Sequence, residues 1–536
     1  MLWWKNYWPK EVENCIEERR AGERNICIYK DMAFSMYLAF KKTAVRLPEK
    51  TVIADWRGRA YSYKYLLEMT DKTASWLQEQ AGVKKGCRLG ILLFNGIEFV
   101  VAYLAASKIG AVAVPLPGKF QKPEILSLVE KSQAAAVICE EKFKPWLQEI
   151  RGVKIIASKS EGDWGLECLS VGSGCRDLGK EERRACLEDD AILMFTSGTT
   201  SKSKGVILKN YHVMNSVEAY IKTLNLSEKD SSLIATPMYH VTGMICILLV
   251  FLTVGGTVFI QPKVDGDAVL RCFLKEKITF YHASPTVFSI LLEKRKEYPV
   301  IPWVRGFACG SGNMAPENIK KLKEWMPKAQ FHTVYGLTET AGAGVIFPGG
   351  AADSPWIGSS GVPMPDLKVK IMEGSRELEA EEIGEICLKG SFVLESYHKP
   401  WPDLISEDGW LRTGDLGYYN QAGYLYIVDR KKDMINRGGE KICSFDIENV
   451  LHTLPYVAEA AVVAVPDEKY MEVPAALIRM EKGKEALEEE LKEQLKTRIA
   501  AFKIPKYIVF TDQIPKTHNG KIDKKKIREI MKQQIF

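Results

Sequence analysis

The stretch AILMFTSGTTSKSKGVIL, residues 191–208, places a loop of small polar residues between two apolar runs. The runs at 191–195 and 206–208 are short and rich in branched side chains, which is typical of strands. The loop at 196–205 combines hydroxyl groups, glycines and two lysines, so its closely spaced donors and positive charge suit a phosphate chain. It is not a Walker A loop, because Ser203 and Gly205 stand where that motif needs glycine and a hydroxyl residue.

Strand-like and helix-like segments alternate on both sides of this loop, from about residue 66 to residue 255. Apolar runs at 87–93, 110–115 and 134–138 are separated by helical patterns such as 96–108. This alternation predicts an α/β fold built from layered subdomains. Between residues 356 and 430 short strands and turns dominate, at 367–371, 384–388 and 423–428, which predicts a β-rich antiparallel subdomain.

A charged run, DRKKD at residues 429–433, marks a domain boundary. The piece that follows has strand patterns at 460–465 and 474–478. Leu487, Leu491, Leu495 and Ile499 are spaced four apart, which predicts one apolar face of a helix. We therefore expect a large domain at residues 1–429 and a small α+β domain at 434–536, joined by residues 430–433.

The composition is that of an ordinary globular protein. Of the 536 residues, 46% are hydrophobic and 26% charged, and the net charge of +6 is too small for a dedicated nucleic-acid binder. The longest apolar stretch, 244–254, is too short to cross a bilayer and predicts a buried helix, so we expect no integral membrane segment. Twelve cysteines form no C-x-x-C pair, which favours free thiols in a reducing cytoplasm.

Three further motifs carry chemistry. In YGLTET, residues 335–340, the strand-like run opens into a polar loop, where open α/β sheets place ligands. There Tyr335 could stack on a base, and Glu339 could hold Mg²⁺ beside phosphates. In WLRTGD, residues 410–415, the carboxylate of Asp415 could accept hydrogen bonds from two ribose hydroxyls, and the turn NGK at 519–521 presents Lys521.

Taken together and in order, TSGTT, YGLTET, WLRTGD, DRKKD, NRGGEK and NGK resemble the adenylate-forming, or AMP-binding, superfamily of acyl-CoA synthetases, luciferases and peptide-synthetase adenylation domains. The resemblance covers nearly the whole chain, from about residue 61 to residue 528. It implies a two-step reaction in which a carboxylate attacks the α-phosphorus of ATP and a thiol then displaces AMP. ATP, Mg²⁺ and coenzyme A are the implied cofactors, and a small-molecule carboxylic acid is the implied substrate.

The resemblance also assigns roles to residues. Lys521, Glu339 and His240 are expected to be catalytic, and Glu339 is also the expected Mg²⁺ ligand. Lys521 would bridge the carboxylate and the α-phosphate, since the approach of two anions needs a preorganised cation. The implied ATP and AMP site consists of Thr196, Ser197, Gly198, Thr199, Thr200, Lys204, Gly310, Ser311, Gly312, Tyr335, Gly336, Thr338, Asp415 and Arg430.

The second step would use the same cavity after a movement of the small domain. The resemblance makes residues 430–433 a hinge with its pivot at Lys432. Rotation would withdraw Lys521 and bring up Gly438, Gly439 and Lys441 to bind coenzyme A. The family's loop usually has glycine and proline where this chain has Ser201 and Ser203, and glycine is common at Met471, but no charge that the chemistry needs is missing.

The acyl pocket is only partly defined by sequence. Residues 237–243 resemble the family's acid-binding turn, where peptide-synthetase domains have an aspartate for the substrate's amino group. They contain no Asp or Glu, so an ammonium group would lack its partner and amino acids are not the expected substrates. Acetate-specific relatives have tryptophan where this chain has Gly336, so the resemblance implies a longer or wider pocket here. Medium or long aliphatic acids and aryl acids both remain open.

The leading hypothesis is therefore an acid–CoA ligase. One alternative is an acyl-AMP ligase that loads a carrier protein, and another is a non-catalytic nucleotide-binding relative. The non-catalytic relative is disfavoured because Lys521, Glu339 and Asp415 are all present. No nucleic-acid partner is expected, and an oligomer is compatible with the sequence.

Overall fold

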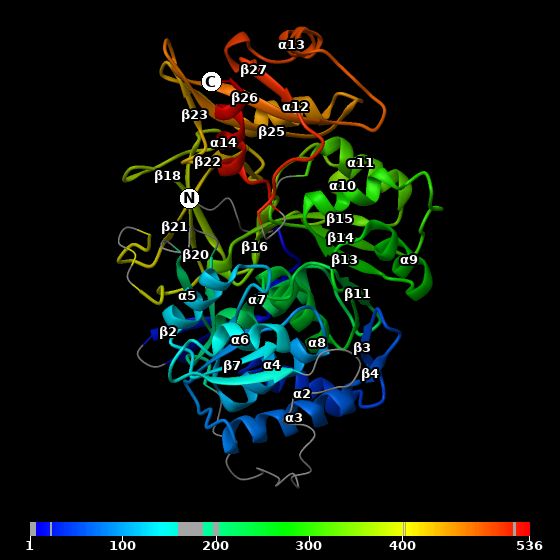
Figure 1. Cartoon of the computed structure of the whole chain (residues 1–536), viewed down its shortest axis with the longest axis vertical. Helices are drawn as coiled ribbons and strands as arrows, with labels where there is room; N and C mark the ends of the chain where they lie inside the picture. The colour runs from blue at the N-terminus through cyan, green and yellow to red at the C-terminus, as the bar shows by residue number, and fades with distance from the viewer. Residues whose placement is uncertain are drawn as a thin grey trace.

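The computed structural model describes residues 7–21, 24–158, 186–196, 203–312, 314–399, 401, 404–517 and 521–535. Figure 1 shows a large body that contains the N-terminal elements and a smaller C-terminal body, orange to red, at one end of the long axis. The mixed α/β architecture and the division into a large and a small part agree with the fold class predicted from the sequence.

The first subdomain is built on a sheet of six described strands. These are β5 (Arg88–Leu92), β6 (Val112–Pro115), β7 (Ala136–Glu140), β8 (Lys154–Ser158), β9 (Asp190–Phe195) and β10 (Gly205–Lys209). Their order is β10-β9-β6-β5-β7-β8, and only β10 runs antiparallel to its neighbour. The predicted apolar runs thus form the centre of a largely parallel sheet. The strands predicted at 191–195 and 206–208 are β9 and the edge strand β10.

Two more sheets complete the α/β part. One contains β3 (Thr51–Asp55), β4 (Ala60–Ser62), β11 (Ser231–Ile234) and β12 (Thr257–Ile260), and the other contains β13 (Phe280–Ala283), β14 (Gly306–Cys309), β15 (Gln330–Gly336), β16 (Gly344–Ile346) and β17 (Val362–Pro363). Strands β13, β14 and β15 are parallel, so their carboxyl ends meet at one edge of the sheet. Residues at that edge share a cavity with Lys521 of the small body.

The helices pack around these sheets. They are α2 (Met36–Arg46), α3 (Tyr63–Glu79), α4 (Ile97–Ile109), α5 (Lys122–Ser132), α7 (Asn210–Thr223), α8 (Val250–Val254), α9 (Gly266–Glu276), α10 (Pro285–Glu293) and α11 (Pro316–Trp325). The apolar stretch at 244–254 is a buried helix as predicted, with a wide π-helical part, η4 (Thr242–Leu249), followed by α8. Helix α4 is buried on nearly every side, which explains why its sequence is apolar throughout.

An antiparallel sheet ends the large body. Its strands are β18 (Lys368–Glu373), β19 (Arg376–Glu377), β20 (Gly384–Lys389), β21 (Leu411–Tyr419) and β22 (Leu425–Arg430). This is the predicted β-rich subdomain, and its last strand runs directly into the charged run at 429–433. At the other end of the chain, β1 (Ile16–Ala21) and β2 (Arg24–Tyr29) form a hairpin.

The small body has its own sheet and helices. The elements are β23 (Ile435–Arg437), β24 (Glu440–Ile442), α12 (Ser444–His452), β25 (Val457–Asp467), β26 (Met471–Met480), α13 (Glu488–Lys496), β27 (Tyr507–Phe510) and α14 (Lys524–Ile535). The predicted apolar helix face is only half right. Leu491 and Leu495 are buried on α13, but the helix begins after Leu487, which is 65% exposed, and ends before Ile499.

Three observations bear on the predicted class of protein. None of the helices in the described ranges is long and apolar enough to cross a membrane. The ten cysteines that the structure describes are all free thiols. Over the same ranges, no three His, Cys, Asp or Glu side chains cluster in a way that could hold a metal ion without other ligands.

Candidate active site

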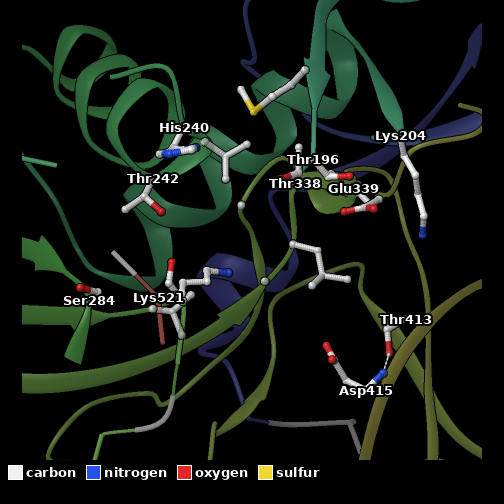
Figure 2. A pocket seen from close by; sticks show the side chains of 18 of the residues that line it. Thr196, Lys204, His240, Thr242, Ser284, Thr338, Glu339, Thr413, Asp415 and Lys521 are labelled. Carbon is white, nitrogen blue, oxygen red and sulfur yellow. Dashed lines mark hydrogen bonds between the residues drawn. The ribbon is translucent and has the colours of Figure 1, made fainter. Parts of the chain in front are cut away.

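A cavity of about 630 Å³ lies at the carboxyl ends of β13, β14 and β15, where β21 and the small body approach them. Its volume is within the usual range for a small-molecule site. In Figure 2, Lys521 extends between a wall that carries His240, Thr242 and Ser284 and the part that carries Glu339 and Asp415. Lys521 belongs to the small body, so the cavity is completed by both parts of the chain.

Most of the residues predicted for the site line this cavity. They are Thr196, Lys204, His240, Gly310, Ser311, Gly336, Thr338, Glu339, Asp415, Arg430, Lys432 and Lys521. Tyr335 and Gly312 are not among the lining residues. Ser197, Gly198, Thr199 and Thr200 lie outside the described residues. The predicted coenzyme A residues Gly438, Gly439 and Lys441 belong to the β23–β24 hairpin and do not line the cavity in this arrangement.

Asp415 sits on β21 and is held from two sides. The Tyr335 hydroxyl donates to Asp415 Oδ2 at 2.9 Å, and Arg430 Nε lies 3.3 Å from Asp415 Oδ1. Burial raises the pKa of Asp415, and the neighbouring Arg430 guanidinium offsets part of that rise. Tyr335 therefore serves the site by orienting a carboxylate as well as by its position next to the cavity.

Glu339 is positioned by the loop that precedes β21. The Tyr397 hydroxyl donates to Glu339 Oε1 at 3.1 Å, and the Glu339 carbonyl accepts from Leu394 N at 2.7 Å. The same Tyr397 ring lies 5.6 Å from Lys204 Nζ, and Trp401 lies on another side at 5.3 Å. Both aromatic contacts restrict a lysine that the sequence predicts to face phosphates. Neither Tyr397 nor Trp401 belongs to a motif, so the sequence alone did not indicate their part in the site.

The charges around the cavity favour an anionic ligand. Five basic side chains line it, Lys204, Arg430, Lys431, Lys432 and Lys521, against the two acidic side chains Glu339 and Asp415. Burial and the nearby Arg430 lower the pKa of Lys521, whereas Asp415 and Glu339 act in the opposite direction. A cluster of this sign suits a triphosphate together with a carboxylate.

The residues present fit Mg²⁺ bound together with a nucleotide. Glu339 offers one carboxylate in the cavity that Thr196 and Lys204 also line. One carboxylate is enough, because Mg²⁺ commonly takes its remaining ligands from substrate phosphates and water.

Gly336 lines the cavity, but its missing side chain would not point into open space. A Cβ atom built there would lie 2.4 Å from the Gly342 carbonyl oxygen and 3.0 Å from the Ala343 carbonyl oxygen. Gly336 therefore permits a close approach of two backbone segments. The sequence-based view that this glycine simply leaves room for a longer acid needs correction, since a larger residue requires the 342–343 backbone to move first.

The two bodies are joined by contacts on both sides of the predicted hinge. Asp429, at the end of β22, accepts from Ser444 N at 2.8 Å and from Ser444 Oγ at 2.6 Å, and Ser444 begins α12. Farther away, Arg479 of β26 pairs with Glu293 of α10 at 2.8 Å. These contacts hold Lys521 at the cavity.

Comparison with known proteins agrees with this geometry. Residues 40–398 match the family model of the AMP-binding enzyme, and residues 446–521 match that of the AMP-binding enzyme C-terminal domain. The chain is 30% identical to the medium-chain acyl-CoA ligase of Macaca fascicularis, with 92% of this chain and 86% of that protein covered. It is also 30% identical to an oxalate–CoA ligase of Arabidopsis thaliana, with 90% and 96% covered.

A solved structure supports the same grouping. The o-succinylbenzoate CoA synthetase of Bacillus subtilis, in complex with its acyl-adenylate intermediate, superposes with a TM-score of 0.81 at 28% identity over 91% of this chain and 97% of that one. The same synthetase has been solved with ATP and a magnesium ion. With two family models covering most of the chain and the motif residues gathered around one cavity, the chain belongs to the AMP-binding enzyme family.

Proposed function

We infer that this protein is an ATP-dependent carboxylic acid–CoA ligase. It would form an acyl-adenylate and pyrophosphate, and then transfer the acyl group to the thiol of coenzyme A with release of AMP. The observation that carries the proposal is the presence of Lys521, Glu339, Asp415 and Lys204 around one cavity, in a chain whose relatives are named as CoA ligases.

In the first step we assign one task to each charged group. Lys521 would lie between the acid's carboxylate and the α-phosphate and reduce their repulsion. Asp415 and Arg430 would hold the ribose, and residues 196–204 would hold the β- and γ-phosphates. When Mg²⁺ is bound, Glu339 would hold it, and the ion would neutralise phosphate charge. Support comes from the excess of basic side chains and from the hydrogen bonds that fix Asp415 and Glu339.

In the second step we propose that the small domain, 434–536, turns about Lys432 within the hinge 430–433 and leaves the large domain, 1–429. The turn would break the Asp429–Ser444 and Glu293–Arg479 contacts and remove Lys521. It would bring the β23–β24 hairpin to the cavity, where Gly438 and Gly439, both at positive φ, let a slim pantetheine arm pass close to the backbone. His240 would flank the path of the carboxylate and the thiol.

Partners and location follow from the same proposal. Besides ATP, the proposed partners are a small carboxylic acid and coenzyme A, and we propose no nucleic-acid partner. The free thiols of the described cysteines favour a reducing compartment, for which we propose the cytoplasm. An oligomer is compatible with this proposal.

Mass spectrometry tests the proposal directly. Purified protein is incubated with ATP, Mg²⁺, coenzyme A and a mixed panel of aliphatic, aryl and sterol-type carboxylic acids. We expect acyl-CoA together with AMP. Acyl-AMP without thioester would support the alternative, an acyl-AMP ligase that loads a carrier protein. The absence of both products with every acid would contradict a ligase.

A further inference from the structure

The cavity wall contains a buried histidine that the proposed reaction does not use. His282 is on β13, is 2% exposed, and lines the cavity. Its Nδ1 atom has no hydrogen-bonding partner among the described residues. A buried polar atom without a partner is costly and needs an explanation. Nδ1 is enclosed by the protein, so a group of the ligand would reach the imidazole through its other nitrogen, Nε2.

The surroundings of His282 leave room for such a group. A Cβ atom on Gly310 would lie 3.3 Å from His282 Nε2, so the absence of a side chain at Gly310 keeps this edge of the imidazole uncovered. On another side the ring of Tyr220 lies 5.9 Å away between centroids. Tyr220 donates its own hydroxyl proton to the Gly342 carbonyl at 2.7 Å, so that hydroxyl proton is already engaged.

The imidazole is neutral. Burial, and to a lesser degree the nearby His332, lowers the pKa of His282 to about 3. His282 on β13 and His332 on β15 are both in register with Ala308 on β14, the strand between them. Burial lowers the pKa of His332 to about 4. His282 therefore offers one N–H donor and one nitrogen acceptor, and it cannot act as a cation for a second carboxylate.

Two other residues of the cavity wall are uncharged as well. Thr236 and Ser284 line the same cavity, and Thr236 Oγ1 is also buried without a hydrogen-bonding partner in the described part of the chain. The charged lining residues are those that the proposed function assigns to the nucleotide, the metal, the reacting carboxylate or the hinge. A dianionic acid would therefore place its second carboxylate against a wall without a cation.

We propose that His282 is a specificity-determining residue that selects a monocarboxylic acid carrying an uncharged hydroxyl group on its acyl part. A hydroxyl both donates and accepts, so it pairs with His282 Nε2 in either tautomer, whereas a purely hydrocarbon acyl group covers Nε2 and leaves it unpaired. This inference rests on the proposed function and narrows its substrate class from aliphatic or aryl acids in general to their hydroxylated members.

The test compares acids that differ by one hydroxyl. Benzoate and 4-hydroxybenzoate, 3-phenylpropionate and its 4-hydroxyphenyl analogue, hexanoate and both 3- and 6-hydroxyhexanoate, and the diacid hexanedioate are assayed by acid-dependent ATP–pyrophosphate exchange with the full-length chain. We expect kcat/KM to favour the hydroxylated acid about tenfold or more in at least one pair, because the unsubstituted acid leaves a buried polar atom unpaired. We also expect hexanedioate to be the poorest of the six-carbon acids.

Substitutions identify the residue responsible. His282→Leu should abolish the preference while the unsubstituted acid keeps its kcat/KM to within about threefold. His282→Gln, which retains polar atoms, should keep part of the preference, and it serves if the leucine variant does not fold. The control is His332→Leu, since His332 is also buried but does not line the cavity. That variant should keep the full preference even if its thermal stability falls.

The outcomes separate the two proposals. Exchange with some acids but no hydroxyl preference, a preference that survives in His282→Leu, or a preference for hexanedioate would overturn the role of His282 and leave the ligase in place. No exchange with any acid, in this panel or in the mixture above, would overturn the ligase proposal and this inference with it.

Discussion

Gly336 illustrates at the scale of one residue why this site depends on backbone packing. Its Cα is pressed against the backbone at Gly342, so even a methyl group would meet a carbonyl oxygen at 2.4 Å. We expect Gly336→Ala to lower acid activation about tenfold or more with every acid, and to destabilise the fold by about 1–3 kcal/mol, typical of overpacking. Pyrophosphate exchange with short and long acids, together with thermal unfolding, measures both effects. A loss restricted to long acids would show instead that the added methyl group fills an otherwise open pocket.

Lys521 makes a prediction about pH. Because burial and Arg430 lower its pKa, Lys521 loses its charge at a lower pH than an ordinary lysine. The kcat/KM for adenylate formation, which reports the free enzyme, should therefore fall on the alkaline side as pH rises through this lowered pKa. In Lys521→Arg, whose guanidinium stays charged, the alkaline fall should move to higher pH or disappear, whatever the overall rate. An unchanged alkaline fall in that variant would assign the titration to another group.

The sequence motifs identified most charged residues of the site, but few of their supports. Lys204, Glu339, Asp415, Arg430 and Lys521 belong to recognisable motifs, and all five line the cavity. Tyr335, which orients Asp415, is in a motif. Tyr397 and Trp401 are in none, and they reach Lys204 from a loop almost two hundred residues away. His282 was missed because its local sequence is that of an ordinary buried strand. Contacts of this kind depend on tertiary packing rather than on spacing along the chain.

At the scale of elements, the hydrophobic pattern located strands better than helix ends. The apolar runs that predicted β5, β6 and β7 were confirmed because a strand buried on both faces is apolar throughout. The pattern at 487–499 overestimated the length of α13, because apolar residues continue at four-residue spacing beyond both ends of the helix. Leu487 in fact precedes the helix as its N-cap residue and is exposed.

The contact between the end of β22 and the start of α12 makes a prediction at this scale. Ser444 donates twice to the buried carboxylate of Asp429, across the proposed hinge, and so stabilises the arrangement in which Lys521 reaches the cavity. Ser444→Ala removes the hydroxyl donor, and a hydrogen bond to a charged group contributes about 1.5–3 kcal/mol. We expect adenylate formation to slow about tenfold, while thioester formation from supplied acyl-adenylate is unchanged or faster.

Stopped-flow measurement of the two half-reactions checks this prediction. Thr453→Ala is the matched control, because Thr453 lies at the other end of α12 and its hydroxyl contacts Arg498 within the small domain. The control should leave both half-reactions unchanged. Equal slowing of both half-reactions by Ser444→Ala would contradict a role in holding one of two arrangements.

At the scale of the whole molecule, the central claim is that one cavity serves two reactions through two positions of the small domain. The position seen in Figure 1 joins the small domain to the large one and suits the first reaction. In the same position the β23–β24 hairpin, with Gly438, Gly439 and Lys441, does not line the cavity. This position suits adenylate formation but does not bring the proposed coenzyme A residues to the cavity, so we propose that the domain moves between the steps.

The measurement that tests this claim most directly is the pair of half-reactions in Lys521→Ala. Adenylate formation is followed by ATP–pyrophosphate exchange, and thioester formation is followed from supplied acyl-adenylate and coenzyme A. We predict that exchange falls by about a hundredfold or more, because two anions then approach without their cation. Thioester formation should remain near the wild-type rate, since Lys521 has left the cavity in that step. An equal loss in both half-reactions would contradict the two-position account.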